Sequence, residues 1–320
     1  MISAATDVLI IGCGDIGERV ARLERAEGRS VAGLARSDRS ARRLRAAGIQ
    51  PITGDLDALT SVNNLPVKEA VVYYFAPPPG AGVTDPRMEA FVSILDPSRL
   101  PTRVVLISTT GVYGDCHGEW VSEDRPPKPQ ADRARRRLAA ETTLRYWSAA
   151  SGVPIVILRV PGIYGPGYLP ADRLRSGEPV LREEESPFSN RVHADDLAHI
   201  CLAAARRGCP GSAAHPKAVS DVASVSEKVS PRETAAVYNV SDGHPTTMTD
   251  FFYRVADLLG IPRPPAITRE EARSRLGEDM LSYLAESKRI DNRRMREDLG
   301  VELMYPDLAA GLPSCMDRCG

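Results

Sequence analysis

The sequence has few aromatic residues, few lysines and no excess of charge of either sign. Aromatic side chains make up 5% of the 320 residues, which argues against a surface on which nucleic-acid bases stack. The 41 basic and 42 acidic residues give a formal charge of −1, so the broad basic footprint of a nucleic-acid-binding protein is missing. Only five of the basic residues are lysine. We expect no nucleic-acid partner.

Long apolar runs and an export signal are also missing. No run approaches the roughly 20 residues that cross a bilayer, and the stretch from Met1 to Thr6 has no basic region of the kind that opens a signal peptide. The six cysteines form no Cys-x-x-Cys pair, and only Cys315 and Cys319 are close in sequence. Two thiols alone make a poor zinc site. We therefore expect a cytoplasmic protein with reduced thiols, no membrane partner and no metal.

The first half of the chain alternates short apolar runs with longer polar segments that have helical character. Strands that are apolar throughout and alternate with helices indicate an α/β fold whose parallel sheet is covered on both faces. We predict strands at 7–11, 30–35, 49–53, 69–75, 103–108, 154–159 and 235–240, and helices at 15–28, 37–47, 57–63, 85–95, 131–151, 194–207, 249–260 and 291–299.

One stretch fits neither pattern. Residues 208–234 are rich in Ser, Ala and Pro and show no clear period. We interpret this stretch as a surface insertion and as a candidate disordered segment.

The first predicted strand runs into a glycine-rich turn. Its sequence, Gly12-Cys13-Gly14-Asp15-Ile16-Gly17, fits the G-x-G-x-x-G pattern at the start of a helix. In that context Gly12 allows the tight turn, Gly14 lets a pyrophosphate approach the backbone, and Gly17 lets helix and strand pack closely. The helix N-terminus then faces the phosphates. The alternative is a glycine-rich turn that binds nothing.

The end of the second strand predicts which dinucleotide binds. An acidic residue there would accept from the ribose 2′-hydroxyl of NAD, whereas this sequence has Arg36 followed by Ser37. A guanidinium and a hydroxyl suit a 2′-phosphate, so we predict NADP(H) rather than NAD. The alternative is an arginine-rich helix face in solvent.

Two further segments are predicted to complete the cofactor site. Asp55 and Leu56 follow the third strand, where the carboxylate can accept from the adenine amino group or can instead cap a helix. Phe75, Ala76 and Pro77 end the fourth strand and should line the dinucleotide crevice.

The order of these motifs resembles the extended and atypical short-chain dehydrogenase/reductases, also called the NAD-dependent epimerase/dehydratase family. The likeness covers nearly the whole chain and is greatest to the atypical YeeZ-like branch. It rests on the glycine-rich turn and on four later segments, which are 54–56, Ser108-Thr109-Thr110-Gly111-Val112-Tyr113-Gly114-Asp115, Arg159-Val160-Pro161-Gly162-Ile163-Tyr164-Gly165-Pro166-Gly167 and Arg191-Val192-His193-Ala194-Asp195-Asp196.

The resemblance implies a Rossmann-type doubly wound parallel sheet with a smaller C-terminal substrate-binding lobe. We assign 1–159, with about 189–207 and 235–241, to the Rossmann domain, and 160–188 with 242–320 to the lobe. Family chemistry is hydride transfer at a nicotinamide, with a Tyr as acid/base, a Lys that lowers its pKa, and a Ser or Thr that orients the substrate oxygen.

The resemblance places Thr109 at the Ser/Thr position, but the Tyr-x-x-x-Lys pair is replaced by Arg133 and Arg137. Arginine is a poor proton donor. Tyr113 and Tyr164 are therefore our substitute catalytic candidates, although a tyrosine at either place can equally be a packing residue.

Three other features of this region have two interpretations each. His117 and His193 are weaker substitutes for the missing acid/base, and structural hydrogen bonds explain them as well. The arginines at 133 and 135–137 form either a helix face in solvent or a binding site for an anionic substrate group.

Two functions follow from these residues. The first is an NADP(H)-binding oxidoreductase or epimerase-like protein that acts on an unknown small molecule, anionic or similar to a sugar nucleotide. The alternative is a non-catalytic NADP(H)-binding sensor or scaffold. The chain is expected to be a monomer or a homodimer, with the helices Pro86–Leu95 and Ala131–Ser151 as the dimer contact that the family suggests.

Overall fold

The apolar runs predicted as strands join one parallel sheet in the computed structural model, which describes residues 6–58, 62, 65–208 and 234–316. Every neighbouring pair of its strands is parallel. The order across the sheet is β12 (Ala235–Asn239), β7 (Ile155–Val160), β5 (Arg103–Thr109), β4 (Val71–Tyr74), β1 (Val8–Ile11), β2 (Val31–Ala35) and β3 (Gln50–Thr53).

The strand order reverses beside β1. Val8 lies opposite Val31 of β2 on one side and Val71 of β4 on the other. The chain runs from β1 outward to β2 and β3 and then crosses to β4 on the other side of β1. The carboxyl ends of β1 and β4 therefore border the crevice in which doubly wound sheets bind ligands.

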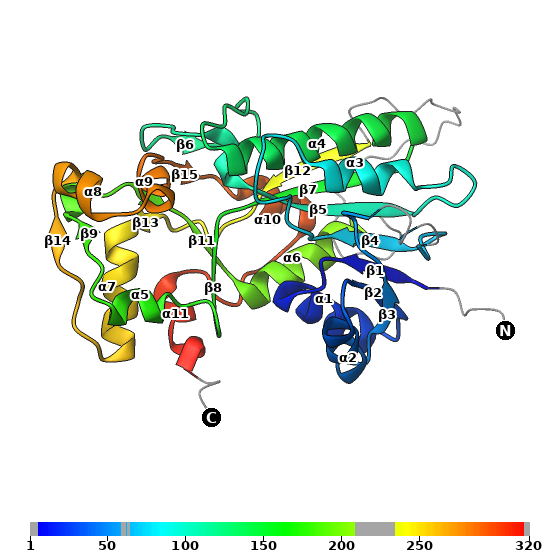
Figure 1. The fold of residues 1–320 in the computed structure, drawn as a ribbon, viewed down its shortest axis with the longest axis horizontal. Coiled ribbons are helices and arrows are strands. Elements are labelled where there is room, and N and C mark those ends of the chain that lie inside the picture. The colour runs from blue at the N-terminus through cyan, green and yellow to red at the C-terminus, as the bar shows by residue number, and fades with distance from the viewer. Residues whose placement is uncertain (1–5, 59–61, 63–64, 209–233, 317–320) are drawn as a thin grey trace, which may run out of the picture.

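Helices cover both faces of the sheet (Figure 1). Val8 and Ile10 point into one core and Leu9 and Ile11 into the other, as the alternation of side chains along a strand requires. The first core is covered by α1 (Asp15–Ala26), α2 (Asp38–Ala46), α6 (Ala194–Arg206) and α10 (Arg293–Leu299), and the second by α3 (Pro86–Ser93) and α4 (Asp132–Ser151).

A smaller lobe lies beyond the carboxyl ends of the strands, at the left of Figure 1. Phe251, Phe252 and Val255 of α7 form its core with Leu308. Its helices are α5 (Ala171–Arg175), α7 (Met248–Leu259), α8 (Arg269–Arg275), α9 (Glu278–Leu284) and α11 (Leu308–Gly311), and its strand pairs are β9 (Val180–Leu181) with β14 (Ala266–Ile267) and β10 (Phe188–Ser189) with β13 (Thr246–Thr247).

Two strand pairs and three short 3-10 helices complete the described chain. β8 (Gly162–Tyr164) pairs with β11 (Arg191–His193), and β6 (Trp120–Val121) pairs with β15 (Arg289–Ile290). These pairs connect the lobe to the sheet. The 3-10 helices are Thr110–Tyr113, Glu183–Glu185 and Pro313–Met316.

The structure confirms the α/β fold with a doubly wound parallel sheet. It corrects the helix expected at 57–63, because Asp57 lies in a turn and Ala58 forms a bridge with Asp55. Residues 59–61 and 63–64 lie outside the described residues, as does 209–233, the greater part of the expected insertion.

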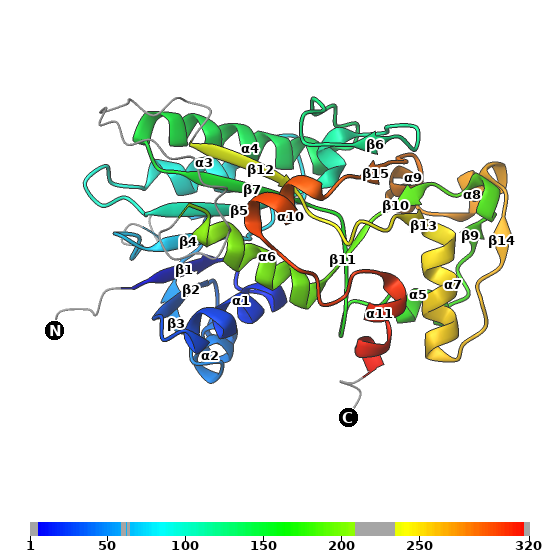
Figure 2. The same ribbon diagram turned by 180° about the vertical axis from the view of Figure 1, so that it is seen from behind.

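The C-terminal part of the chain does not stay within the lobe to which we assigned it. Met295 and Leu299 of α10 belong to the same core as β1, and Figure 2 shows α10 beside β12 and α6, with which it is in contact. The range 242–320 therefore contributes one helix to the Rossmann domain. No helix of the described ranges is long and apolar enough to cross a bilayer.

A buried ion pair joins the long helix α4 to the sheet. Glu141 of α4 accepts hydrogen bonds from Arg159 of β7 at 2.8 and 3.2 Å and from Ser108 of β5 at 2.6 Å. Arg159 also donates to the Tyr113 hydroxyl, which donates in turn to Asn239 of β12. One network thus fixes α4 against three neighbouring strands.

Removing one partner should be costly, because Glu141 and Arg159 are both less than 5% exposed. Glu141→Ala leaves a buried guanidinium without its carboxylate, so we expect a loss of about 3–5 kcal/mol in the free energy of unfolding, measured in urea. The control is Asp132→Ala, which breaks an exposed pair with Arg135 and should cost no more than about 1 kcal/mol. Equal effects of the two substitutions would contradict this role for Glu141.

Candidate functional site

The three glycines of the turn after β1 have different surroundings. Gly12 has a φ of +86°, and a Cβ placed on it would lie 2.3 Å from the backbone nitrogen of Ala76. Only glycine therefore allows the end of β1 to lie against the end of β4. A Cβ on Gly17 would lie 3.2 Å from the Ile10 side chain, which is tighter than most contacts of a Cβ. The lack of a side chain at Gly17 therefore lets α1 pack closely on β1.

Gly14 faces open space. A Cβ built there would meet no atom within 4 Å. Gly14 is also the N-cap of α1, and no side chain caps that helix end. Free backbone N–H groups beside an open space are what a pyrophosphate needs, so the turn fits the phosphates of a dinucleotide.

The other residues of the turn have structural contacts. Cys13 and Ile16 are buried, and burial raises the pKa of Cys13 to about 12, so its sulfur is a thiol rather than a thiolate. Asp15 accepts a hydrogen bond from the buried Arg19 at 2.7 Å, and Arg19 also pairs with Asp195 of α6.

The residues predicted to contact the adenosine lie at the ends of β2 and β3. Arg36 is exposed. The Ser37 hydroxyl accepts from the backbone of Ser40 at 3.2 Å and caps α2. Asp55 accepts from the Asp57 nitrogen at 3.0 Å, and Leu56 is buried.

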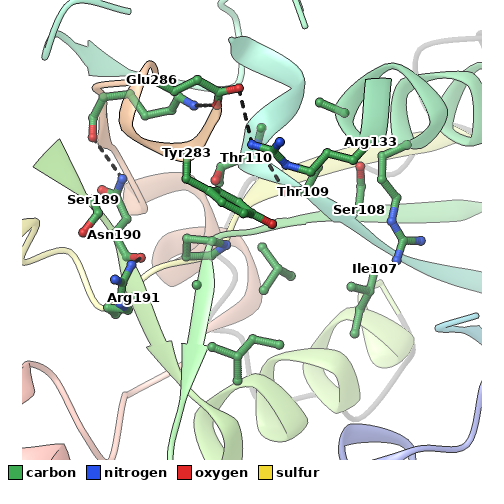
Figure 3. Close-up of a pocket in the computed structure, with 18 of the residues that line it drawn as sticks. Ile107, Ser108, Thr109, Thr110, Arg133, Ser189, Asn190, Arg191, Tyr283 and Glu286 are labelled. Atoms are coloured by element: carbon green, nitrogen blue, oxygen red, sulfur yellow. Dashed lines mark hydrogen bonds and ion pairs between the residues drawn. The ribbon is translucent and has the colours of Figure 1, made fainter. Parts of the chain in front are cut away.

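Of the three residues that follow β4, Phe75 packs against the sheet core and Ala76 lies beside Gly12. Pro77 lines a cavity of about 730 Å³ between the sheet and the lobe. The cavity begins at the carboxyl ends of β5 and β7, with Thr109 and Val160, and extends to Phe251 and Phe252 of α7. Figure 3 shows the labelled residues of this cavity.

Three of the four arginines at the start of α4 line the cavity, so this group is not a solvent-exposed face. Arg133, Arg136 and Arg137 share one side of the helix, and Arg135 points outward, where it pairs with Asp132. The guanidinium groups of Arg136 and Arg137 donate to the Gly82 and Ala76 carbonyls at 2.7 and 3.1 Å. They thereby fix the segment that follows β4.

The opposite wall is also cationic. Arg191 stacks on the Phe251 ring, 4.1 Å from its centroid, and burial lowers the pKa of Arg191 to about 10. The guanidinium therefore stays charged at neutral pH. Lys288 pairs with Glu286 at 2.6 Å. Among the lining residues, five are cationic and Glu286 is the only carboxylate.

The catalytic candidates separate into two groups. Thr109 lines the cavity. Tyr113 does not, because it is 1% exposed and its hydroxyl is held between Arg159 and Asn239. Tyr164 is fully buried and donates to the Asp307 carbonyl at 3.1 Å. The geometry therefore gives both tyrosines structural contacts and supports neither as a proton donor.

The two histidines also have structural contacts. His117 is exposed and pairs with Asp115 at 3.0 Å. His193 is fully buried, caps α6 by accepting from the Asp195 nitrogen, and lies 3.0 Å from the Ser314 hydroxyl. Within the described ranges no cluster of three or more His, Cys, Asp or Glu residues could hold a metal.

Sequence reasoning missed several residues of the cavity, among them Tyr168, Tyr283, Glu286 and Lys288. Tyr168 directly follows the family segment that ends at Gly167, which was a usable signal. Tyr283 lies in the short helix α9, and Glu286 and Lys288 lie between α9 and β15. The sequence shows no periodicity there, and only the fold brings these residues to α4.

A family profile matches residues 8–215, and its description is NAD dependent epimerase/dehydratase family. The chain belongs to this family. The match covers more than half of the chain and includes the glycine-rich turn and the segments that gave the resemblance. The narrower likeness to the YeeZ-like branch stays a prediction. No curated protein matches the chain.

Solved structures of the same fold cover nearly the whole chain. A functionally unknown conserved protein from Silicibacter pomeroyi DSS is 28% identical, with a TM-score of 0.73 over 96% of this chain and 97% of that one. MoeE5 in complex with UDP-glucose and NAD is 23% identical, with a TM-score of 0.66 over 96% of each chain. A UDP-glucose 4-epimerase from Thermotoga maritima is 17% identical, with a TM-score of 0.71 over 96% of each.

The pH dependence of stability should report the burial of His193, because burial lowers its pKa to about 4. A histidine of the unfolded chain takes up a proton near pH 6.5, so between those values the unfolded state binds more protons. His193 then contributes stability that is complete above about pH 6.5 and falls by about 3 kcal/mol as the pH approaches 4.

The measurement is urea unfolding at several pH values. His193→Asn should reduce the loss of stability between pH 6.5 and 4. His199→Asn, at an exposed position on the same helix, should leave it unchanged. An unchanged slope in His193→Asn would show that His193 is not the group responsible.

Proposed function

We propose that the protein is an NADP(H)-preferring oxidoreductase or epimerase that acts on an anionic substrate similar to a sugar nucleotide. The observation that carries the proposal is the charge of the cavity, where five cationic side chains face one carboxylate. Guanidinium groups removed from water are costly without a counter-charge. A phosphate or carboxylate of the substrate would supply that charge through strong hydrogen bonds.

The size of the cavity supports a substrate larger than a simple alcohol. Its volume of about 730 Å³ falls within the range of pockets that bind drug-sized molecules and cofactors. MoeE5 was also solved with UDP-glucuronic acid and NAD. UDP-glucuronic acid is a nucleotide sugar that carries both phosphate and carboxylate groups. That molecule is therefore our first probe.

The chain's own residues would hold the two ligands in adjacent spaces. The free N–H groups after Gly14 would bind the pyrophosphate, and Arg36 would bind the 2′-phosphate. A bound nicotinamide supplies a hydride acceptor or donor. Thr109 ends β5 in the cavity, so its hydroxyl would orient the substrate oxygen. Arg191 would bind an anionic group of the substrate.

Cofactor preference tests the role of Arg36. By calorimetry, NADPH should bind more tightly than NADH, and Arg36→Ala should weaken NADPH binding about 10- to 100-fold because a charge-assisted hydrogen bond is lost. NADH binding should change little. Arg22→Ala, an exposed arginine on α1, is the control. Preferential binding of NADH would overturn the proposal that Arg36 binds the 2′-phosphate.

Binding of UDP-glucuronic acid, measured by calorimetry, tests whether Arg191 binds an anionic group of the substrate. Arg191→Gln should weaken its binding about tenfold or more, since one charged partner is removed. Arg135→Gln removes an equal charge from the outer side of α4 and should have no effect. Equal binding by the wild type and Arg191→Gln would contradict an anion site at Arg191.

The non-catalytic alternative rests on Arg133 and Arg137 at the Tyr and Lys positions. It predicts tight binding of the dinucleotide with no oxidation or reduction across a panel of sugar nucleotides and carbonyl compounds. Cofactor turnover with any of these compounds would exclude a sensor or scaffold.

A further inference from the structure

The proposed chemistry needs a hydroxyl acid/base in the cavity, and the family position for it holds Arg133. The tyrosines near the site differ in how their hydroxyl groups are engaged. Those of Tyr113 and Tyr164 are hydrogen-bonded and buried. Tyr168 lines the cavity, but burial and the nearby Asp15 carboxylate raise its pKa to about 12.

Tyr283 of α9 differs from all three. It lines the cavity, is 49% exposed, and its hydroxyl has no hydrogen-bond partner among the residues that the structure describes. Figure 3 shows its ring projecting into the middle of the cavity. A phenol that is accessible and uncommitted is free to exchange a proton with a substrate.

Arg133 holds Tyr283 in this position. The Arg133 guanidinium lies 3.8 Å from the centroid of the Tyr283 ring, and its Nη1 donates to the Ser282 hydroxyl at 2.6 Å. Its Nη2 lies 4.0 Å from Glu286. The arginine at the family's tyrosine position thus contacts three residues of the segment that carries Tyr283.

The segment after Tyr283 is anchored independently of Arg133. Asn190 donates to the Lys288 carbonyl at 3.0 Å and accepts from the Ile290 nitrogen at 2.8 Å. The Ser287 carbonyl accepts from the Cys116 and Gly118 nitrogens. The segment that follows Tyr283 is therefore held in place by hydrogen bonds to other parts of the fold.

We propose that Tyr283 is the acid/base residue of this protein and that Arg133 is its positioning residue. The proposal rests on the proposed function, since it assumes hydride transfer in this cavity. It explains how the family chemistry survives the loss of tyrosine at position 133, because the lobe supplies the hydroxyl from the opposite wall.

The proposed reaction moves one proton and one hydride, which leave or reach the substrate at different atoms. In the oxidation direction the Tyr283 phenolate oxygen would take the proton of the substrate hydroxyl as the substrate carbon loses a hydride, which a bound oxidised nicotinamide would accept, and a carbonyl would result. In the reverse direction the Tyr283 hydroxyl would return the proton to the substrate oxygen as the carbonyl carbon gains a hydride, which a bound reduced nicotinamide would supply. A guanidinium over the ring stabilises the negative charge on the phenolate in both directions.

The first test measures contact between Tyr283 and the ligands without requiring turnover. Tetranitromethane nitrates accessible phenols, and mass spectrometry locates the modified residues. NADP⁺ with UDP-glucuronic acid should slow nitration of Tyr283 about tenfold, because a ligand in such a pocket buries most of its surface. Tyr146, which is 75% exposed on α4, should react equally with and without ligands.

Unchanged nitration of Tyr283, with both ligands shown by calorimetry to be bound, would overturn the proposal while the proposed function stands. If calorimetry detects neither ligand on folded protein, the proposed function fails, and this inference fails with it. Calorimetry therefore separates the two failures.

The second test is kinetic and uses whichever substrate of the panel is turned over. Tyr283→Phe keeps the ring under Arg133 and should lower kcat about 100-fold or more with little change in KM. Arg133→Met should lower kcat about tenfold, and Arg133→Lys should largely restore it, since an ammonium also binds a ring face. A kcat near the wild-type value in Tyr283→Phe would overturn the proposal, and failure of lysine to rescue would overturn the positioning role.

Discussion

The buried pair of Glu141 and Arg159 is the interaction on which the site depends. It joins α4 to β7, and Ser108 and Tyr113 extend it to β5 and to the 3-10 helix Thr110–Tyr113 that follows β5. Arg133 and Arg137 lie on α4 about two turns and one turn before Glu141, so their place on the cavity wall follows from where this pair holds the helix. Tyr113 belongs to the same network, which explains why its hydroxyl is committed to structure.

Much of the fold was predictable from the sequence because its signals are local. Apolar strands alternate with helices along the chain. The glycine at position 12 marked the turn after β1, and the structure shows why a glycine is needed there, since its φ is positive and a side chain would collide with Ala76. The site was only partly predictable. The arginines of α4 were recognised, but whether they face solvent or a cavity depends on the lobe packed opposite. Tyr283 lies in the short helix α9 and Lys288 directly precedes the short strand β15. Distant contacts, such as those of Asn190, fix the place of this segment, and no local pattern marks it.

Arg133 and Arg137, at the positions where the resemblance predicts the family's Tyr and Lys, add two positive charges to the wall of the cavity. Arg137 donates to the end of β4 and Arg133 contacts the segment that carries Tyr283, so both charges are used to position neighbouring groups. An always-charged group cannot itself exchange a proton, but it stabilises a neighbouring group that does. In this account the cationic cavity selects an anionic substrate, and the same charge favours the proton transfer.

The most direct test of this account is a crystal structure of the protein with NADP⁺ and UDP-glucuronic acid. The account predicts that the nicotinamide lies at the carboxyl ends of β4 and β5, with a sugar carbon about 3–3.5 Å from its reacting carbon. The oxygen on that carbon should lie within hydrogen-bond reach of the Thr109 and Tyr283 hydroxyls. A sugar nucleotide bound away from the cationic walls, or a nicotinamide outside the cavity, would contradict it.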